Sequence, residues 1–198
     1  MGRGLELEEG LEEKLRRLRD DPVLFAEAVL GFKSFPYQER LLRDPSKRIV
    51  SCMGRQTGKT STIAVKAVHF AATHPGTTTL IVAPSRRQSM IMFDRILSFI
   101  YGNEFLPPCV VRRTRTLVEF DQGSRIIALP CSRNLLRGFT ASLVIVDEAA
   151  FVPEDVITQV IFPMLATTGG AMIMLSTPWG RDNVFYRAFV NPDYSVYN

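Results

Sequence analysis

The chain has 198 residues, 46% of them hydrophobic, and a formal net charge of +4 at pH 7. With few low-complexity stretches, this composition predicts one sizeable globular domain. No apolar run is long enough to span a membrane, and the first residues are too charged for a secretory signal peptide. Glu6 stands where a myristoylation signal requires Ser or Thr, and the three cysteines are too widely spaced to offer a metal-ligand pair. We therefore expect a cytosolic protein that binds no membrane.

The N-terminal segment reads as helical in two parts over residues 7–30. Leu11, Leu15 and Leu18 form one apolar stripe, and Asp20-Asp21-Pro22 restarts a second helix. Residues 31–36 form a linker, after which a short helix begins at Tyr37. We expect residues 1–34 to be a helical appendage to a domain that spans residues 35–198.

A short apolar strand at residues 48–52 leads into a loop, Ser51 to Thr60, that opens into a mostly apolar helix over residues 61–70. A Gly-x-Lys-Thr loop in this context binds phosphate, because its backbone N–H groups and the helix N-terminus converge on one point. Lys59 would add its ammonium group there, and Thr60 would offer a hydroxyl to Mg²⁺. The full pattern asks for Gly where Met53 stands, so Gly54 is expected to supply the turn. The alternative is an ordinary Gly turn between a strand and a helix.

The next elements alternate in the same way, which predicts a mainly parallel sheet flanked by helices. Residues 78–84 read as a buried strand and residues 86–101 as an apolar helix. Residues 117–120 and 125–129, joined by Asp121-Gln122-Gly123-Ser124, read as a β-hairpin that interrupts the parallel alternation. The basic clusters at residues 86–87 and 112–115 are either nucleic-acid contacts or a solvated face.

Residues 141–150 form a continuous apolar strand that ends in two adjacent carboxylates, Asp147 and Glu148. Ligands of open α/β sheets bind beyond the carboxyl ends of the strands, so these acids should face the same crevice as the phosphate loop. Asp147 would hold Mg²⁺ through water, and Glu148 would orient and polarise an attacking water. The alternative is that the acids stabilise the first turn of the next helix by capping it. That role explains one carboxylate more easily than two.

The remaining elements are predicted as a helix near residues 153–160, a strand at residues 171–178 and a last helix near residues 184–189. Together the loop at residues 55–60, the acidic strand end at residues 147–150 and Ser176-Thr177-Pro178 resemble the ATPase domain of the large terminase subunit of tailed bacteriophages. The resemblance spans roughly residues 35–190. In that family the phosphate loop often lacks its first Gly and carries Arg-Gln, as Arg55-Gln56 does here.

This resemblance implies an α/β fold of the P-loop NTPase class, in its additional-strand catalytic-glutamate (RecA-like) type, with ATP and Mg²⁺ as cofactors. Tyr37 and Gln38 resemble the adenine-contacting segment, although a helix cap or core tyrosine explains them about equally well. Ser176 and Thr177 resemble the coupling motif that senses the γ-phosphate, with a strand-ending turn as the alternative. The expected nucleotide-binding residues are Tyr37, Gln38, Gly54, Arg55, Gln56, Thr57, Gly58, Lys59, Thr60, Ser61, Ser176 and Thr177.

An arginine finger is a further implication, and such a group is worth on the order of 10³ to 10⁵ in rate. Leu135-Leu136-Arg137-Gly138 resembles the segment that carries it, which makes Arg137 the first candidate, acting on the ATP of a neighbouring subunit. Arg55, acting in cis from inside the phosphate loop, and Arg133 are the competing candidates.

The resemblance implies a motor domain that drives double-stranded DNA into a procapsid in the host cytoplasm. Its partners would be a homo-oligomeric ring on the portal protein and the small terminase subunit. Family members continue into a metal-dependent nuclease domain, and this sequence shows no clustered carboxylates for one. We expect a truncated chain without nuclease activity. The alternatives are a helicase-like remodelling ATPase, and a nucleotide-binding module without hydrolysis, which Glu148 disfavours.

Overall fold

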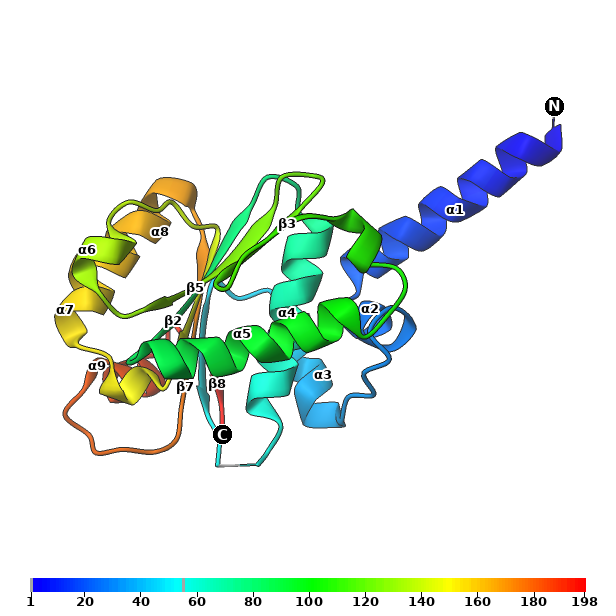
Figure 1. Cartoon of the computed structure of the whole chain (residues 1–198). Coiled ribbons are helices and arrows are strands. Elements are labelled where there is room, and N and C mark those ends of the chain that lie inside the picture. The colour runs from blue at the N-terminus through cyan, green and yellow to red at the C-terminus, as the bar shows by residue number, and fades with distance from the viewer. Residues whose placement is uncertain (1, 55) are drawn as a thin grey trace.

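The computed structural model describes residues 2–54 and 56–198, and side chains from residue 9 onward within these ranges. Its centre is one eight-stranded sheet with the order β3-β4-β5-β2-β6-β7-β1-β8 among the described residues (Figure 1). The strands are β1 Arg48–Cys52, β2 Thr78–Ala83, β3 Val110–Arg113, β4 Leu117–Phe120, β5 Arg125–Pro130, β6 Leu143–Asp147, β7 Ala171–Ser176 and β8 Ser195–Tyr197.

Six neighbouring strands of this sheet, from β5 to β8 in spatial order, run parallel. Strand β7 lies between β1, which precedes the phosphate loop, and β6, which ends in the two acids. This extra strand between them is the arrangement that the additional-strand class requires, so the expected fold class is confirmed.

Helices cover both faces of the sheet (Figure 1). They are α1 Gly2–Asp20, α2 Pro22–Ala28, α3 Pro36–Arg43, α4 Lys59–Thr73, α5 Arg86–Tyr101, α6 Arg133–Leu136, α7 Glu154–Val156, α8 Phe162–Thr168 and α9 Val184–Phe189. Among the described helices, none is both long and apolar enough to cross a bilayer.

Alternate residues of each central strand serve different cores, because successive side chains of a strand point to opposite faces. Ile49, Ile145 and Ile173 join the core beneath α2 to α5. Val50 and Met174 join the core beneath α6 to α9. Burial on both faces explains why β6 and β7 appear in the sequence as nearly continuous apolar runs.

The predicted hairpin is present, since β4 and β5 pair antiparallel. Strand β5 also pairs parallel with β2, so half of the hairpin belongs to the central sheet. Strand β3 extends the hairpin at the sheet edge, where the sequence had shown only a basic cluster. Its mostly exposed residues carry no apolar alternation, which is why no strand was predicted.

The helix expected near residues 153–160 continues to Thr168, through a π-helical segment at Ile157–Ile161. Pro163 lacks a backbone donor and usually ends a helix, but here the change from π-helical to α-helical turns falls just before it. The prediction was therefore too short. Strand β8 was also missed, because three residues give too little pattern to recognise.

The N-terminal helices form in two parts as predicted, with Asp21 capping α2 by accepting from the N–H of Val23. Helix α2 buries Val23 and Phe25 against the body of the domain, whereas α1 projects away from it (Figure 1). The domain boundary at residue 34 stays a prediction.

Candidate functional site

The phosphate loop links β1 to α4 at the carboxyl edge of the sheet. Gln56 and Gly58 adopt left-handed backbone conformations, with φ of 63° and 76°. Two observations favour glycine at position 58. Its φ is left-handed, and a Cβ there would lie 2.7 Å from Nε2 of Gln38. Gly54 is exposed and is not one of the left-handed positions among the described residues, so Gln56 and Gly58 make the turn expected of it. Met53 is 7% exposed and packs in the core, which accounts for an apolar residue in the place of Gly.

Lys59 begins α4 and is 8% exposed, with one long hydrogen bond from its Nζ to the carbonyl of Met53, at 3.5 Å. The N–H groups of the first turn of α4 and this ammonium group therefore lie together at the loop. Thr60 is half-buried in the same turn. The hydroxyl of Ser61 accepts from Nε of Arg95 on α5 at 3.0 Å, which turns Ser61 toward that helix.

The segment at the start of α3 touches the loop directly. The hydroxyl of Tyr37 donates to the carbonyl of Thr57 at 2.6 Å, and the side chain of Gln38 lies against Gly58. Gln38 is 4% exposed, and its amide oxygen accepts from the N–H of Phe35 at 2.9 Å. Phe35 is exposed and stacks on Tyr37, with ring centroids 6.1 Å apart. The sequence did not single out Phe35, because one exposed aromatic residue carries no pattern.

The two acids and the serine of the third motif meet at the ends of adjacent strands. Cys52 of β1 is in register with Ser176 of β7, and Leu175 of β7 with Asp147 of β6. The hydroxyl of Ser176, which is fully buried, donates to Oε2 of Glu148 at 3.4 Å. Glu148 itself has a left-handed φ of 49°, an uncommon conformation for a residue with a Cβ. The fold thus brings together three strand ends that lie far apart in sequence.

Asp147 is 8% exposed, and burial raises the pKa of its carboxyl to about 6, with the neighbouring charge of Glu148 acting in the same direction. Its Oδ1 accepts from the N–H of Glu148 at 3.0 Å, and Lys59 opposes the shift. A carboxylate that is desolvated in this way gains from a nearby cation. The donor set therefore fits a divalent ion held by oxygen ligands.

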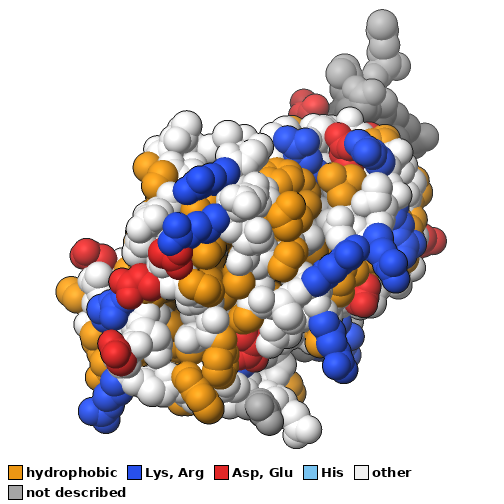
Figure 2. Space-filling model, turned by 60° about the vertical axis from the view of Figure 1, so that its left-hand side comes forward, with side chains coloured by type: hydrophobic (Ala, Val, Ile, Leu, Met, Phe, Trp, Pro, Cys, Tyr) orange, Lys and Arg blue, Asp and Glu red, His pale blue; other side chains and the backbone are white. Residues whose placement is uncertain are grey.

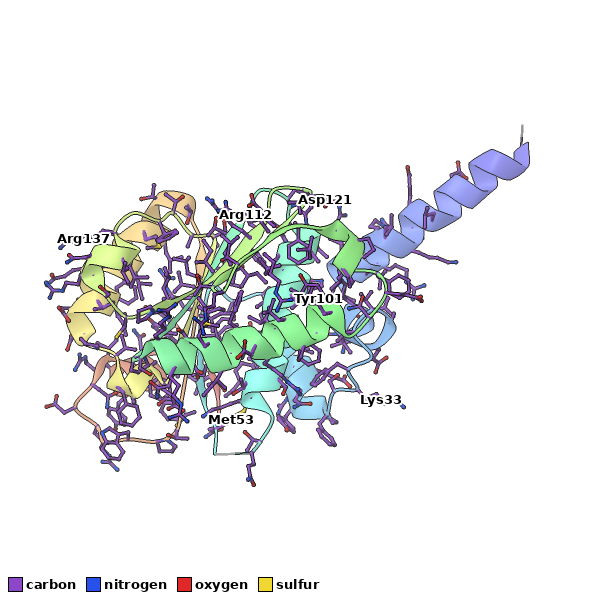
Figure 3. The ribbon with its side chains drawn as sticks, viewed as in Figure 1. Lys33, Met53, Tyr101, Arg112, Asp121 and Arg137 are labelled. Carbon is purple, nitrogen blue, oxygen red and sulfur yellow. The ribbon has the colours of Figure 1, made fainter. Side chains whose placement is uncertain are left out.

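Arg137 follows α6 and is exposed; in Figure 3 it lies at the upper left, away from Met53 at the lower edge of the view. Arg133, one turn earlier, is held in an ion pair by Asp155 of α7. No ion pair joins Arg137 to a described residue. Arg55 lies outside the described residues. The fold thus separates Arg137 from its own phosphate loop and engages Arg133 elsewhere.

Comparison with known proteins agrees with this geometry. A family model for the N-terminal part of the terminase large subunit, T4likevirus-type, matches residues 51–193. The large terminase subunit of Thermus phage G20c is 34% identical over 194 residues, covering 89% of this chain. The chain belongs to the large terminase subunit family. It spans only 39% of the length of that relative.

Solved terminase structures share the fold. The large terminase ATPase domain of Thermus phage P74-26 is 28% identical with a TM-score of 0.79, covering 89% of this chain and 85% of that one. The large terminase of bacteriophage D6E in complex with ATP-gamma-S has a TM-score of 0.64 at 12% identity, covering 82% of this chain and 44% of that one.

Two further features of this terminase chain were not predicted from the sequence, one beside the site and one further along α4. Trp179 is 63% exposed in the loop after Ser176, and its ring lies 5.1 Å from that of Phe151, three residues after Glu148. The pair joins the segments that follow β6 and β7, beside a pocket of about 360 Å³ that Cys52 also lines. In the sequence, the Ser-Thr-Pro motif was the one signal that pointed to a functional role for this loop.

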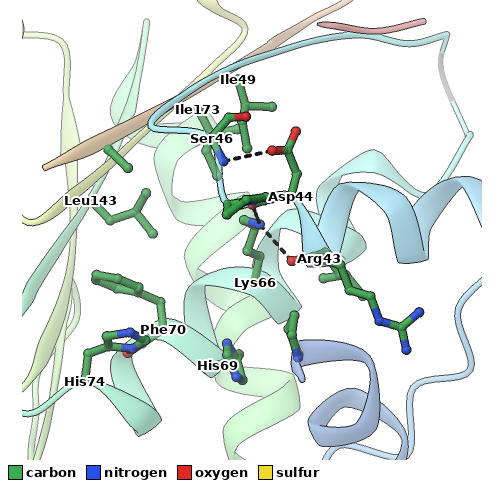
Figure 4. A pocket seen from close by; sticks show the side chains of 14 residues that line it. Arg43, Asp44, Ser46, Ile49, Lys66, His69, Phe70, His74, Leu143 and Ile173 are labelled. Atoms are coloured by element: carbon green, nitrogen blue, oxygen red, sulfur yellow. Dashed lines mark hydrogen bonds between the residues drawn. The ribbon is translucent and has the colours of Figure 1, made fainter. Parts of the chain in front are cut away.

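The other unpredicted feature lies further along α4, around a pocket of about 330 Å³. There Lys66 points at the chain after α3 (Figure 4) and donates to the carbonyls of Leu41, Leu42 and Asp44 at 3.0, 2.8 and 2.8 Å. His69 lies one turn beyond, with Nε2 3.0 Å from the carbonyl of Arg19. These groups hold α1 and α3 on α4, about two to three turns away from the phosphate loop.

The basic clusters are exposed. Arg86 and Arg87 begin α5, and Arg112 and Arg113 belong to β3, with Arg113 stacked 4.7 Å from the ring centre of Tyr101. On the face drawn in Figure 2, Lys and Arg side chains stand singly or in small groups among hydrophobic and acidic ones. Their role as phosphate contacts stays a prediction.

Proposed function

We propose that this chain is the ATP-hydrolysing motor domain of a viral DNA-packaging terminase. Membership of the large terminase family supports this, and so does the nucleotide analogue in the D6E large terminase, whose fold this chain shares. The observation that carries the proposal is the convergence of the phosphate loop, Asp147, Glu148 and Ser176 at one edge of the sheet. Ligands of open α/β sheets bind at that edge.

The phosphates of ATP would lie in the loop, on the N–H groups of the first turn of α4 and the ammonium group of Lys59. Thr60 and Asp147 would hold Mg²⁺ there, and the ion would neutralise charge on the phosphate oxygens. The burial of Asp147 supports this role, because a nearby cation would stabilise the carboxylate that burial disfavours. Gln56, Thr57 and Gly58 would complete the cradle around the phosphates.

Glu148 would position and polarise the attacking water. Its contact with Ser176 supports a coupling role for the third motif, because a change at the γ-phosphate would shift the carboxylate and thereby the buried hydroxyl. Thr177 follows Ser176 into the loop that carries Trp179. This loop is the segment through which hydrolysis would be transmitted.

The base of ATP would lie beside the start of α3. The Tyr37 hydroxyl is bonded to the phosphate loop and the Gln38 amide is nearly buried, so both would act by fixing the shape of this wall. Phe35 is the exposed aromatic residue of the segment and would offer a surface on which the base stacks.

Arg137 would complete catalysis on the ATP of a neighbouring subunit. Its exposure, and its position away from its own phosphate loop, support action in trans (Figure 3). The ion pair of Arg133 with Asp155 argues against that residue. The intact protein would then work as a ring on the portal, with the small terminase subunit and double-stranded DNA as partners, in the host cytoplasm.

Steady-state ATP hydrolysis tests this proposal when Arg137→Ala is mixed in increasing proportion into the wild type. We expect specific activity to rise with protein concentration and to fall faster than dilution by the variant predicts, because each variant subunit leaves a neighbour's site incomplete. Activity that falls only in proportion to the variant would contradict catalysis in trans. Absence of turnover at every concentration, with Mg²⁺ present, would contradict the ATPase itself.

A further inference from the structure

Two hydroxyl groups at the start of α4 are bonded differently from those in the other helices. Elsewhere, the described Ser and Thr hydroxyls inside helices donate to a backbone carbonyl one turn earlier. They belong to Thr62, Thr73, Ser89, Ser98, Thr158, Thr167 and Thr168. No hydrogen bond runs from the O–H of Thr60 or Ser61 to a described residue, and both lie beside Lys59 in the first turn of α4. These two hydroxyls are therefore available to a ligand, which for Thr60 is the proposed Mg²⁺.

The neighbours of Ser61 account for its free O–H group. The carbonyl one turn before it, that of Thr57, accepts instead from the hydroxyl of Tyr37 at 2.6 Å. The oxygen of Ser61 accepts from Nε of Arg95 at 3.0 Å. A hydroxyl that accepts from a charged group becomes a stronger donor through its own hydrogen, because hydrogen bonds in a chain polarise one another. Ser61 thus keeps a strengthened donor within the turn whose N–H groups have no helical partner.

Arg95 is held beside this turn by the packing of α5 against α4 (Figure 1). The next residue, Ile96, is fully buried in the same core as Ile63 of α4. The guanidinium of Arg95 lies over the ring of Phe99, 4.9 Å from its centre. No ion pair joins Arg95 to a residue that the structure describes. Its position is thus fixed, and no described carboxylate neutralises its charge.

We propose that Arg95 is a positioning residue for nucleotide binding that acts through Ser61. Arg95 holds the oxygen of Ser61, and the O–H of Ser61 donates to a phosphate oxygen of the nucleotide in the loop. This inference rests on the proposed function, because it requires ATP at the N-terminus of α4. It extends the phosphate site from the loop to α5, a helix that the sequence motifs leave out.

Equilibrium binding of ATP-gamma-S with Mg²⁺, measured by titration calorimetry, tests this inference. We expect Ser61→Ala to weaken binding about tenfold, because it removes a hydrogen bond to a charged acceptor, and Arg95→Met to weaken it about fivefold. The double variant should bind no more weakly than Ser61→Ala alone, since Arg95 acts through that hydroxyl. Turnover at saturating ATP should change by less than about twofold in Arg95→Met. Losses that multiply in the double variant would overturn the relay through Ser61.

Arg113→Met is the matched control, because Arg113 is also exposed and stacks on an aromatic ring of α5, 4.7 Å from the centre of Tyr101. This variant should bind ATP-gamma-S within about twofold of the wild type, and Arg95→Lys, which keeps a charged donor, should recover most of the affinity that Arg95→Met loses. Equal affinity of the wild type and folded Arg95→Met would overturn the inference and leave the proposed function intact. A wild type that binds no ATP-gamma-S would contradict both.

Discussion

Two lysines on helix α4 differ in how fully the protein hydrogen-bonds their ammonium groups. Lys59, at the first position, makes one hydrogen bond to the described residues, of 3.5 Å to the carbonyl of Met53. Lys66, two turns later, makes three of 2.8 to 3.0 Å, which cover the last carbonyls of α3. The ammonium group of Lys66 is thus saturated by the protein, whereas that of Lys59 keeps most of its bonding capacity for a ligand.

This comparison separates structural from functional polar groups within one helix. Burial lowers the pKa of Lys66 to about 8, so the group is still charged at neutral pH and donates to all three carbonyls. His69 and Asp44 near it are likewise bonded to their neighbours. At the end of β6, Asp147 has a carboxyl whose charge burial disfavours and Lys59 favours. Lys66 thus stabilises the packing of α3 on α4, whereas Lys59 and Asp147 are the groups that a bound ligand or cation would stabilise.

The largest effect is expected at Lys59. Replacing it by Ala should reduce ATP turnover on the order of 10²- to 10³-fold, because the phosphate loses its preorganised cation. The unfolding free energy should change little, since only one weak hydrogen bond is lost. Turnover and urea denaturation, measured on the same preparation, check both parts. A strongly destabilised variant would contradict the comparison.

Lys66→Met should show the reverse pattern. Three carbonyls would lose their donor, which we expect to cost about 2–4 kcal/mol of stability, while turnover per folded molecule changes by less than about twofold. Lys33→Met is the control, because Lys33 is exposed. The comparison fails if Lys66→Met abolishes turnover in protein that remains folded.

Asp147→Asn should stabilise the metal-free domain while abolishing turnover. The pKa of this carboxyl is raised to about 6, so above that pH the folded state bears the cost of a buried charge. Asn removes the charge and keeps the acceptor for the N–H of Glu148, a gain of about 1–3 kcal/mol at pH 7. Thermal unfolding with a chelator present checks this, with the exposed Asp94→Asn as the control. A lower melting temperature would show that Asp147 is structural.

His69 should produce a smaller, pH-dependent effect. Burial lowers its pKa to about 4, so its contribution to stability is complete above pH 6.5 and is lost as the pH falls toward 4. The stability difference between wild type and His69→Gln should therefore shrink by up to about 3 kcal/mol over that window. Comparison with this variant is needed because Asp147 titrates in an overlapping pH range and its effect on stability has the opposite sign. A difference that is independent of pH would contradict the assignment.

The sequence predicted the buried strands and the polar residues that follow them, because apolar runs followed by Gly-Lys-Thr or paired acids are strong local signals. It did not predict strand β3 or the helix through Pro163, which are stabilised by tertiary pairing and a π-helical turn. Lys66 and Trp179 were missed because a single residue carries no periodicity. The contact between Ser176 and Glu148 was also out of reach, since strand order decides which ends become neighbours.

The most direct test of the central claim compares ATP binding and ATP turnover in Glu148→Gln. The account predicts that the amide variant binds ATP with Mg²⁺ about as tightly as the wild type and hydrolyses it on the order of 10²- to 10⁴-fold more slowly, because only the group that polarises the water has changed. Turnover that persists at the wild-type rate would contradict the assignment of Glu148 and with it the proposed chemistry of this site.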